Sequence, residues 1–153
     1  MKITITKTEK TAPVTILHLD GTLDGANYES LIDEAKKVYA ARARDLILDM
    51  STLTFISSAG LASLHQVALL FRGVKHPGQD GGWAAYHAID RDRGSGTQAH
   101  VKLLSPTKQV REVLDMTGFN SLFEIYTDPH QASASFHQTA PTMEARLPYK
   151  VLR

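Results

Sequence analysis

Residues 49–61, Asp49-Met-Ser-Thr-Leu-Thr-Phe-Ile-Ser-Ser-Ala-Gly-Leu61, indicate the end of a buried strand, a tight loop and the first turn of a helix. The preceding run from Leu46 is apolar and of strand length. Beyond the glycine, apolar residues recur at helical spacing: Leu61, Leu64, Val67, Ala68 and Phe71. We therefore predict a helix from Ser58 to about Arg72, with Ser57 or Ser58 as its N-cap.

The start of this helix is a candidate site for an added anion. A helix N-terminus offers unpaired amides and the positive end of the dipole. A serine hydroxyl held there is a candidate phosphate acceptor, although the local pattern alone favours a plain helix cap. Asp49 interrupts the apolar run near the expected carboxyl end of the strand, where sites form in open sheets. We favour a simpler role for it, as a carboxylate that satisfies loop amides.

The rest of the chain alternates between strand and helix patterns. The predicted strands are Ile3–Thr6, Val14–Leu19, Leu46–Met50, Val101–Leu104 and Leu122–Tyr126. Asp20-Gly21 is a turn signal. A helix follows Asp24, which could cap it. Its apolar positions are Tyr28, Leu31, Ile32, Ala35, Val38 and Tyr39.

Two further helices are predicted towards the C-terminus. Ser105-Pro106 has the composition of a helix start, and Gly118 that of a helix end. Asp128-Pro129 caps a short helix that ends near Gln138. The order of elements predicts an α/β fold with a mixed, mostly parallel sheet of about five strands and about four helices. The first strand adds antiparallel at an edge.

Composition limits the classes of function. The chain has 153 residues, enough for one domain with a sizeable core, and a formal net charge of +1. A near-neutral chain has no general attraction for nucleic acid. The sequence has no cysteine, which excludes thiol chemistry and suits a reducing cytosol. It also lacks a signal peptide and an apolar run long enough to span a membrane, so we expect a cytoplasmic protein.

Three motifs, in a characteristic order, resemble those of the STAS domain, the fold of the anti-sigma factor antagonists. They are Asp20-Gly-Thr-Leu-Asp24, the stretch from Asp49 to Leu61, and Leu103-Leu-Ser-Pro-Thr-Lys-Gln-Val with Leu114-Asp-Met-Thr-Gly118-Phe. The resemblance implies a STAS-type fold over residues 1–138. Residues 74–98 then form a glycine-rich insertion, either a mobile surface loop or a partner-contacting flap. Residues 139–153 form a C-terminal tail.

The family's central loop usually has the pattern Asp-Ser-Ser/Thr-Gly-Leu, with its first serine phosphorylated. Aligned on Gly60, this serine is Ser58; Ser57 stands where the family has aspartate, and Ala59 where it has Ser or Thr. The resemblance implies that a partner binds at this loop. The implied partner-binding residues are Asp24, Ser57, Ser58, Ala59, Gly60 and Leu61. The implied partner is an anti-sigma factor that is also a serine kinase of the ATP-binding type.

In this reading the protein is no enzyme and needs no cofactor. Phosphorylation of Ser58 would place nearly two negative charges in the contact and switch binding off. The alternative within the family is a scaffold or ligand-sensing module without phosphorylation, which the departures at positions 57 and 59 favour. A hydrolase using Ser57 or Ser58 lacks the expected Gly-x-Ser-x-Gly elbow. The spacing of His76, His87 and His100 gives no metal-binding pattern.

Overall fold

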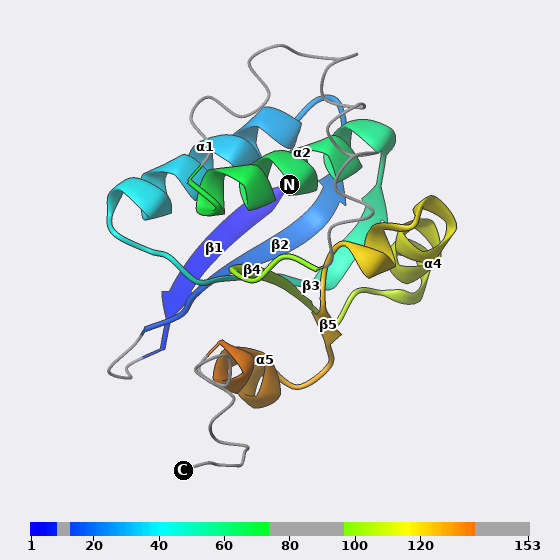
Figure 1. The fold of residues 1–153 in the computed structure, drawn as a ribbon. Helices are drawn as coiled ribbons and strands as arrows, with labels where there is room; N and C mark the ends of the chain where they lie inside the picture. Colours follow the sequence, from blue (N-terminus) through cyan, green and yellow to red (C-terminus); the bar gives the residue numbers. More distant parts are fainter. Residues whose placement is uncertain (9–12, 74–96, 137–153) are drawn as a thin grey trace.

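A computed structural model describes residues 1–8, 13–73 and 97–136. Its centre is a five-stranded sheet in the order β1-β2-β3-β4-β5 (Figure 1). The strands are β1 Lys2–Lys7, β2 Thr15–Leu23, β3 Leu46–Ile56, β4 Val101–Leu104 and β5 Ile125–Tyr126. β1 pairs antiparallel with β2, and every other pairing is parallel. The predicted mixed, mostly parallel sheet with an antiparallel edge strand is confirmed.

Helices cover the sheet unequally on its two faces. α1 Tyr28–Ala40 and α2 Ser58–Phe71 lie side by side on one face (Figure 1). α4 Lys108–Thr117 lies at the end of the sheet, and α5 Pro129–Ser135 lies on the opposite face from α1 and α2. A short 3-10 turn, η1 Phe119–Ser121, follows α4. None of the helices within the described ranges combines the length and the apolar character needed to cross a membrane.

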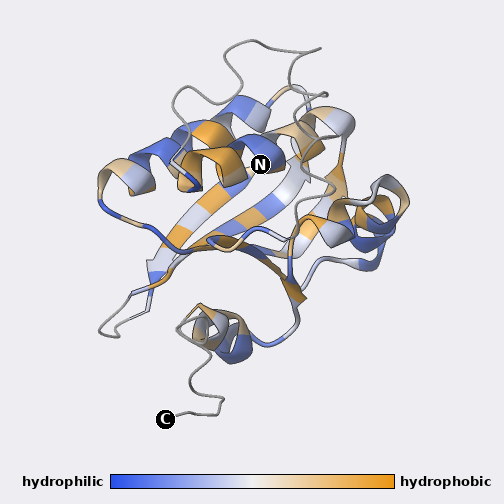
Figure 2. Ribbon diagram, viewed as in Figure 1, coloured by the Kyte–Doolittle hydropathy of each residue, from blue (hydrophilic) through white to orange (hydrophobic). Residues whose placement is uncertain are grey.

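The main core lies between the sheet and the pair α1–α2. The predicted inner face of α1 is confirmed, because Leu31, Ile32, Ala35 and Val38 are buried. Along β2 and β3, alternate leucines enter the same cluster. Figure 2 shows the resulting contrast, with hydrophobic positions of these helices and strands interspersed with hydrophilic ones. Burial of one stripe per helix holds both helices on the sheet.

A second, smaller apolar cluster lies under α5, where Val14, Ile47, Leu104, Ala132 and Phe136 meet. Lys102 enters this region from β4 with a side chain only 4% exposed. Its Nζ lies 2.6 Å from Glu124 Oε1 and 4.8 Å from the centre of the Phe136 ring. The hydrogen bond from Lys102 holds the pKa of Glu124 below its ordinary value. The lysine is therefore buried as part of an ion pair rather than alone.

Asp20-Gly21 does not form the predicted turn. Both residues lie inside β2, which continues to Leu23. Gly21 has a φ of +111°, and the pairing of β2 with β3 shifts register on both sides of the Asp20–Gly21 pair. At each shift β3 has one residue more than β2, so the dipeptide lies between two bulges of β3, and its glycine takes up the positive φ. Beside it, the hydroxyls of Thr52 and Thr54 donate to the carbonyls of Leu19 and Gly21, at 3.1 and 3.0 Å.

Three predicted boundaries are also wrong. Ser105 has a φ of +52° and lies before the helix, so Thr107 rather than Ser105 is the N-cap of α4. The last strand is shorter than Leu122–Tyr126, because Leu122 ends the 3-10 turn. The last helix ends at Ser135, not near Gln138. Most of the predicted 74–98 insertion and all of the 139–153 tail lie outside the described residues.

Candidate functional site

The loops after β2 and β3 lie side by side at the carboxyl edge of the sheet. Leu23 and Ile56, the last residues of the two strands, are paired in the ladder. The next amide, that of Ser57, donates to the carbonyl of Leu23 at 2.9 Å. The sheet therefore brings the Asp24 turn next to the loop 57–60, which the family resemblance implied by assigning both to one partner-binding site.

Ser57 and Ser58 have different environments, although they are adjacent in sequence. Ser57 is the N-cap of α2, and its Oγ accepts the amide hydrogen of Gly60 at 3.2 Å. Ser58 is the first residue of the helix and is exposed. The Ser57 hydroxyl thus caps the start of the helix, whereas the Ser58 hydroxyl is open to solvent at the positive end of the helix dipole.

Gly60 allows the start of α2 to approach the end of β2 closely. A β-carbon at this position would lie 2.6 Å from the Leu23 carbonyl oxygen and 2.8 Å from Ile56 Cγ1. Neither approach is compatible with a side chain, and the first involves backbone that cannot rotate away. Leu61 follows with 7% of its surface exposed, inside the main core. Of the predicted partner-binding residues, Gly60 and Leu61 are therefore buried and support the loop from the core side.

Asp24 does not cap α1, as one of its predicted roles required. The N-cap of α1 is Asn27, and no side chain caps the helix there. Asp24 instead organises the turn before it: Oδ1 accepts the Ala26 amide at 2.9 Å, and its own amide donates to Asn27 Oδ1 at 3.0 Å. Asn27 Nδ2 in turn donates to the Thr22 carbonyl at 2.8 Å. The turn is closed by its own side chains, with Asp24 left partly exposed.

A third strand end contributes the start of α4. Thr107 Oγ1 accepts the Val110 amide at 3.4 Å and donates to the Leu53 carbonyl at 2.8 Å. The second bond joins the helix to β3 beyond the point where β4 pairs with it. The helix was predicted but this hydrogen bond was not, because a threonine after proline carries no sign of a partner 54 residues away in sequence.

Two large apolar side chains are exposed near these elements. Phe55, the residue before the last of β3, is 51% exposed, and Met116 near the end of α4 is 85% exposed. Neither was among the predicted partner-binding residues. Adjacent strand residues point to opposite faces, so the burial of Ile56 turns Phe55 outwards. That alternation was the signal that could have found it.

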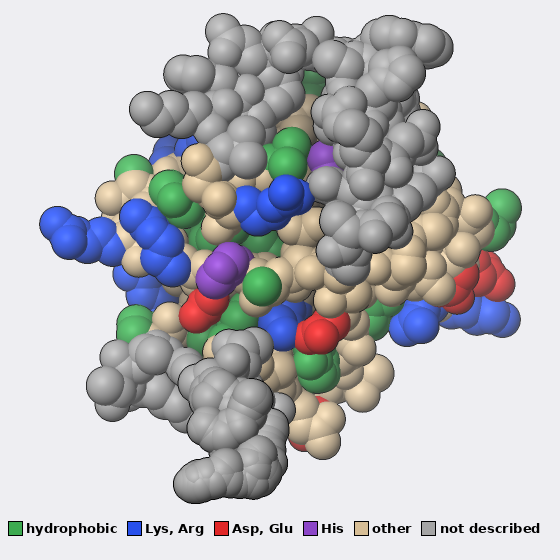
Figure 3. Space-filling view, viewed as in Figure 1, with side chains coloured by type: hydrophobic (Ala, Val, Ile, Leu, Met, Phe, Trp, Pro, Cys, Tyr) green, Lys and Arg blue, Asp and Glu red, His purple; other side chains and the backbone are tan. Residues whose placement is uncertain are grey.

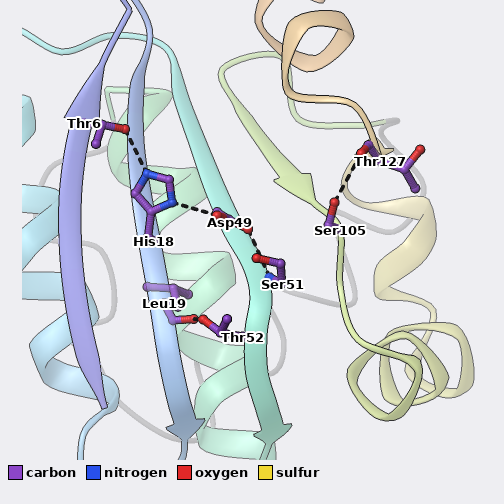
Figure 4. A network of polar contacts seen from close by, with 8 residues as sticks. All are labelled: Thr6, His18, Leu19, Asp49, Ser51, Thr52, Ser105 and Thr127. Carbon is purple, nitrogen blue, oxygen red and sulfur yellow. Dashed lines mark hydrogen bonds and ion pairs between the residues drawn. The ribbon is translucent and has the colours of Figure 1, made fainter.

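A network of polar side chains links the strands β1, β2 and β3 (Figure 4). His18 Nδ1 lies 2.7 Å from Asp49 Oδ2, and His18 Nε2 lies 2.8 Å from Thr6 Oγ1. The Ser51 amide donates to Asp49 Oδ1 at 3.0 Å. Burial alone would raise the pKa of Asp49, but the hydrogen bonds from Ser51 and His18 outweigh it, and the pKa lies below its ordinary value.

Asp49 is thus a structural link between strands. β3 continues for seven residues beyond it, so Asp49 does not lie at the carboxyl end of the strand, as the sequence had suggested. Among the described residues, no group of three histidines, cysteines or acids could hold a metal ion. Basic and acidic side chains both appear on the face shown in Figure 3, with hydrophobic ones between them. The loops at the carboxyl edge of the sheet thus offer another molecule three kinds of group: the exposed Ser58 hydroxyl, the amides at the start of α2 and the exposed Phe55 side chain.

Comparisons with known proteins agree with this arrangement. Residues 5–75 match the model of the STAS domain family. A Bordetella bronchiseptica protein, named "Putative anti-sigma factor antagonist BtrV", is 28% identical over 141 residues, which cover 92% of this chain and 99% of that protein.

Two solved structures share the fold. An anti-sigma factor antagonist from Mycobacterium paratuberculosis has a TM-score of 0.58 at 18% identity, covering 89% of this chain and 95% of the other. The anti-sigma factor antagonist SpoIIAA, in its unphosphorylated form, has a TM-score of 0.53 at 17% identity, covering 88% of this chain and 96% of the other. The family match over residues 5–75, the curated relative and the shared fold agree that this chain is similar to the STAS domain proteins and has their fold.

Proposed function

We propose that this protein is an anti-sigma factor antagonist whose binding is switched off by phosphorylation of Ser58. It binds an anti-sigma factor, itself a serine kinase, through the loops at the carboxyl edge of the sheet. The observation that carries the proposal is the position of Ser58: exposed, and first in α2, while its neighbour Ser57 caps the helix. The protein supplies the acceptor hydroxyl, and the partner supplies the nucleotide and the catalytic groups.

The division of roles between the two serines supports Ser58 as the acceptor. Ser57 Oγ is engaged with the Gly60 amide, so modifying it would cost the helix its cap. Ser58 has no such duty in the helix start, and its exposure gives a kinase access to the hydroxyl. Phosphorylation of Ser58 would therefore leave the Ser57 cap in place.

Charge supports an off switch at this position. The first turn of α2 contains no acidic residue. In the free protein, a phosphate there is favoured by the helix dipole and the amides of the first turn. In a docked complex the same group would bury nearly two negative charges, and their desolvation opposes binding. Phosphorylation would therefore weaken the complex without unfolding the protein.

The surroundings of Ser58 support a protein partner. Phe55 is a large exposed apolar side chain on the strand that leads to the loop, and Asp24 and Ala59 are partly exposed beside it. Aromatic side chains are enriched in interfaces. Gly60 and Leu61, both buried, would hold the contact surface in shape. The name of the Bordetella relative points to the same class of function.

The decisive experiment compares Ser58→Ala with Ser58→Asp in binding to the cognate anti-sigma factor. We expect the alanine variant to bind like the unmodified protein and the aspartate variant to bind at least about tenfold more weakly. Ser121→Asp, at an exposed serine beyond the other end of α4, is the matched control for added charge and should bind normally. Equal binding by the two Ser58 variants would end the switch model.

One observation favours a second candidate, a STAS module with the same partner surface but no phosphorylation. Ser57 occupies the position where the family has aspartate, so a group that a kinase could use is missing. Mass spectrometry of the protein from its own cells separates the two. Phosphate on Ser58 supports the switch, whereas its absence under all growth conditions supports the unmodified module.

A further inference from the structure

β1 is an exposed edge strand of unusual regularity. It has six residues, five of which are exposed, and Ile5 is 42% exposed. Within the described part of the chain, it pairs on one side only, with β2. The opposite edge of the sheet is the two-residue strand β5. One edge of the sheet is therefore short, while the other presents a full-length strand.

An open edge strand carries a row of backbone donors and acceptors that another strand can pair with. Proteins that avoid such pairing use proline, bulges or charges along the edge. β1 has no proline, and its pairing with β2 is regular from Lys2 to Lys7, with no register shift. Its charges stand only at the two ends, on Lys2 and Lys7. The middle of the strand, from Ile3 to Thr6, carries no such protection.

We propose that two copies of this chain associate by antiparallel pairing of their β1 strands, with the two-fold axis at Thr4. In this register Thr4 lies opposite Thr4 of the second copy. Ile3 lies opposite Ile5 twice, and Lys2 lies opposite Thr6 twice. Ile3 is already packed against the main core, so the exposed Ile5 would continue that apolar surface into the second copy.

The sequence of the strand favours this register over its neighbours. Directly opposite residues have their side chains on the same face of the sheet, so the neighbouring registers are those centred on Ile3 or Ile5. A shift to Ile5 opposite Ile5 puts Lys7 opposite Ile3. The Thr4-centred register forms two isoleucine pairs, whereas the registers centred on Ile3 or Ile5 form one each, and it leaves no lysine opposite an isoleucine. A second copy is thus a better occupant than an unrelated strand, because β1 complements itself.

The symmetry also fixes how the two sites are arranged. An antiparallel pair of this kind has its two-fold axis perpendicular to the sheet, which gives one continuous ten-stranded sheet with the α1–α2 pairs of both copies on the same face. The axis reverses the strand direction, so the two Ser58 loops lie at opposite ends. Each copy can then bind its own partner. Association through β1 and the state of Ser58 are expected to be independent, and either proposal can fail alone.

The absence of cysteine from the chain makes a direct test possible. Residues directly opposite in an antiparallel pair have Cα atoms about 4.5–5.5 Å apart, within reach of a disulfide. Thr4→Cys should therefore form a disulfide-linked dimer under mild oxidation. Ile5→Cys should not, because the two copies of residue 5 are diagonal neighbours at about 7–8 Å. Met116→Cys, 85% exposed on α4, controls for random collision.

Sedimentation equilibrium of the full chain supplies the second measurement. We expect a concentration-dependent dimer, and Ile5→Lys should weaken it about tenfold by replacing two apolar pairs with charge. Circular dichroism verifies that this variant is folded, and Ser58→Asp should leave the dimer constant unchanged. A monomer at every concentration, or equal crosslinking of the Thr4 and Met116 cysteine variants, would overturn the proposal. So would crosslinking of Ile5→Cys ahead of Thr4→Cys.

Discussion

The helices α2 and α4 begin at the same edge of the sheet, yet the hydroxyl groups at their starts are used differently. At α2, Ser57 uses its hydroxyl on the Gly60 amide, and the next hydroxyl, Ser58, stays exposed. At α4, Thr107 both accepts the Val110 amide and donates to the Leu53 carbonyl. One helix start presents a hydroxyl to other molecules, and the other uses its hydroxyl to hold the sheet.

The difference teaches that a capping pattern in sequence does not reveal whether the start of a helix is a site. Both starts contain small hydroxyl residues after a strand, and both satisfy the first turn of the helix. What separates them is a spare hydroxyl at α2 and a tertiary bond at α4. The predictions below test that separation, beginning with the substitution expected to have the largest effect.

Gly60→Ala should destabilise the protein by about 3 kcal/mol, the upper range for overpacking, because the new methyl group meets the Leu23 carbonyl at 2.6 Å. Urea unfolding measures the effect. Gly25→Ala is the matched control, since a β-carbon there has no atom within 4 Å. If the two variants were equally stable, the close packing of the α2 start on β2 would be wrong.

Thr107→Val should cost about 2 kcal/mol in unfolding free energy, because it removes both the cap and the bond to the Leu53 carbonyl. Thr107→Ser keeps the hydroxyl and should recover most of the loss. A serine variant as unstable as the valine variant would show that the methyl group matters, not the hydrogen bonds.

Ser57→Ala should cost about 1 kcal/mol through loss of the α2 cap. Ser58→Ala should stay within about 0.5 kcal/mol of the unmodified protein, because its side chain is exposed. Thermal unfolding of the two variants, measured side by side, gives the contrast. The reverse order of stabilities would assign the cap to Ser58 and remove the basis for calling its hydroxyl spare.

The contribution of Asp49, in the sheet between the two helix starts, to the stability of the protein should depend on pH. The pKa of Asp49 is lowered in the folded protein, so its contribution to stability is complete well above the unfolded value of about 3.9 and is lost as pH falls below it. Asp49→Asn should therefore cost up to about 1 kcal/mol at pH 7 and progressively less below pH 4.

Asp33→Asn, at an exposed carboxylate on α1, is the matched control and should change little at either pH. An Asp49→Asn deficit that persists unchanged at low pH would mean that the lost stability comes from packing rather than from the carboxylate charge.

The sequence was most informative where local pattern and tertiary role coincide. The helical spacing from Leu61 predicted α2 within a residue, because burial imposes that period directly. The apolar run at Leu46 predicted the start of β3 but not its end, which lies at Ile56 and not at Met50. The position of Ser58 followed from the same stretch. These features depend on neighbours in sequence, and so they can be read there.

The failures share the opposite property. Asp20-Gly21 has the composition of a turn, but a glycine with positive φ can also lie in a strand opposite bulges of its neighbour, and only the pairing with β3 distinguishes the two cases. Thr107 was missed because its partner, Leu53, is remote in sequence. Asp24 was predicted as a possible N-cap of α1, but the N-cap is Asn27. In each case the deciding contact comes from another strand or loop.

The bulges of β3 opposite Asp20-Gly21 have a mechanical consequence for the loop that follows. Within this irregular stretch, the hydroxyl groups of Thr52 and Thr54 donate to the carbonyls of Leu19 and Gly21 in β2, in addition to the backbone ladder. Because the regular ladder is interrupted here, we expect these strand ends to open more easily than the leucine-filled centre of the sheet. The loop that carries Ser58 would then shift on a fixed base, which would help the proposed partner to dock.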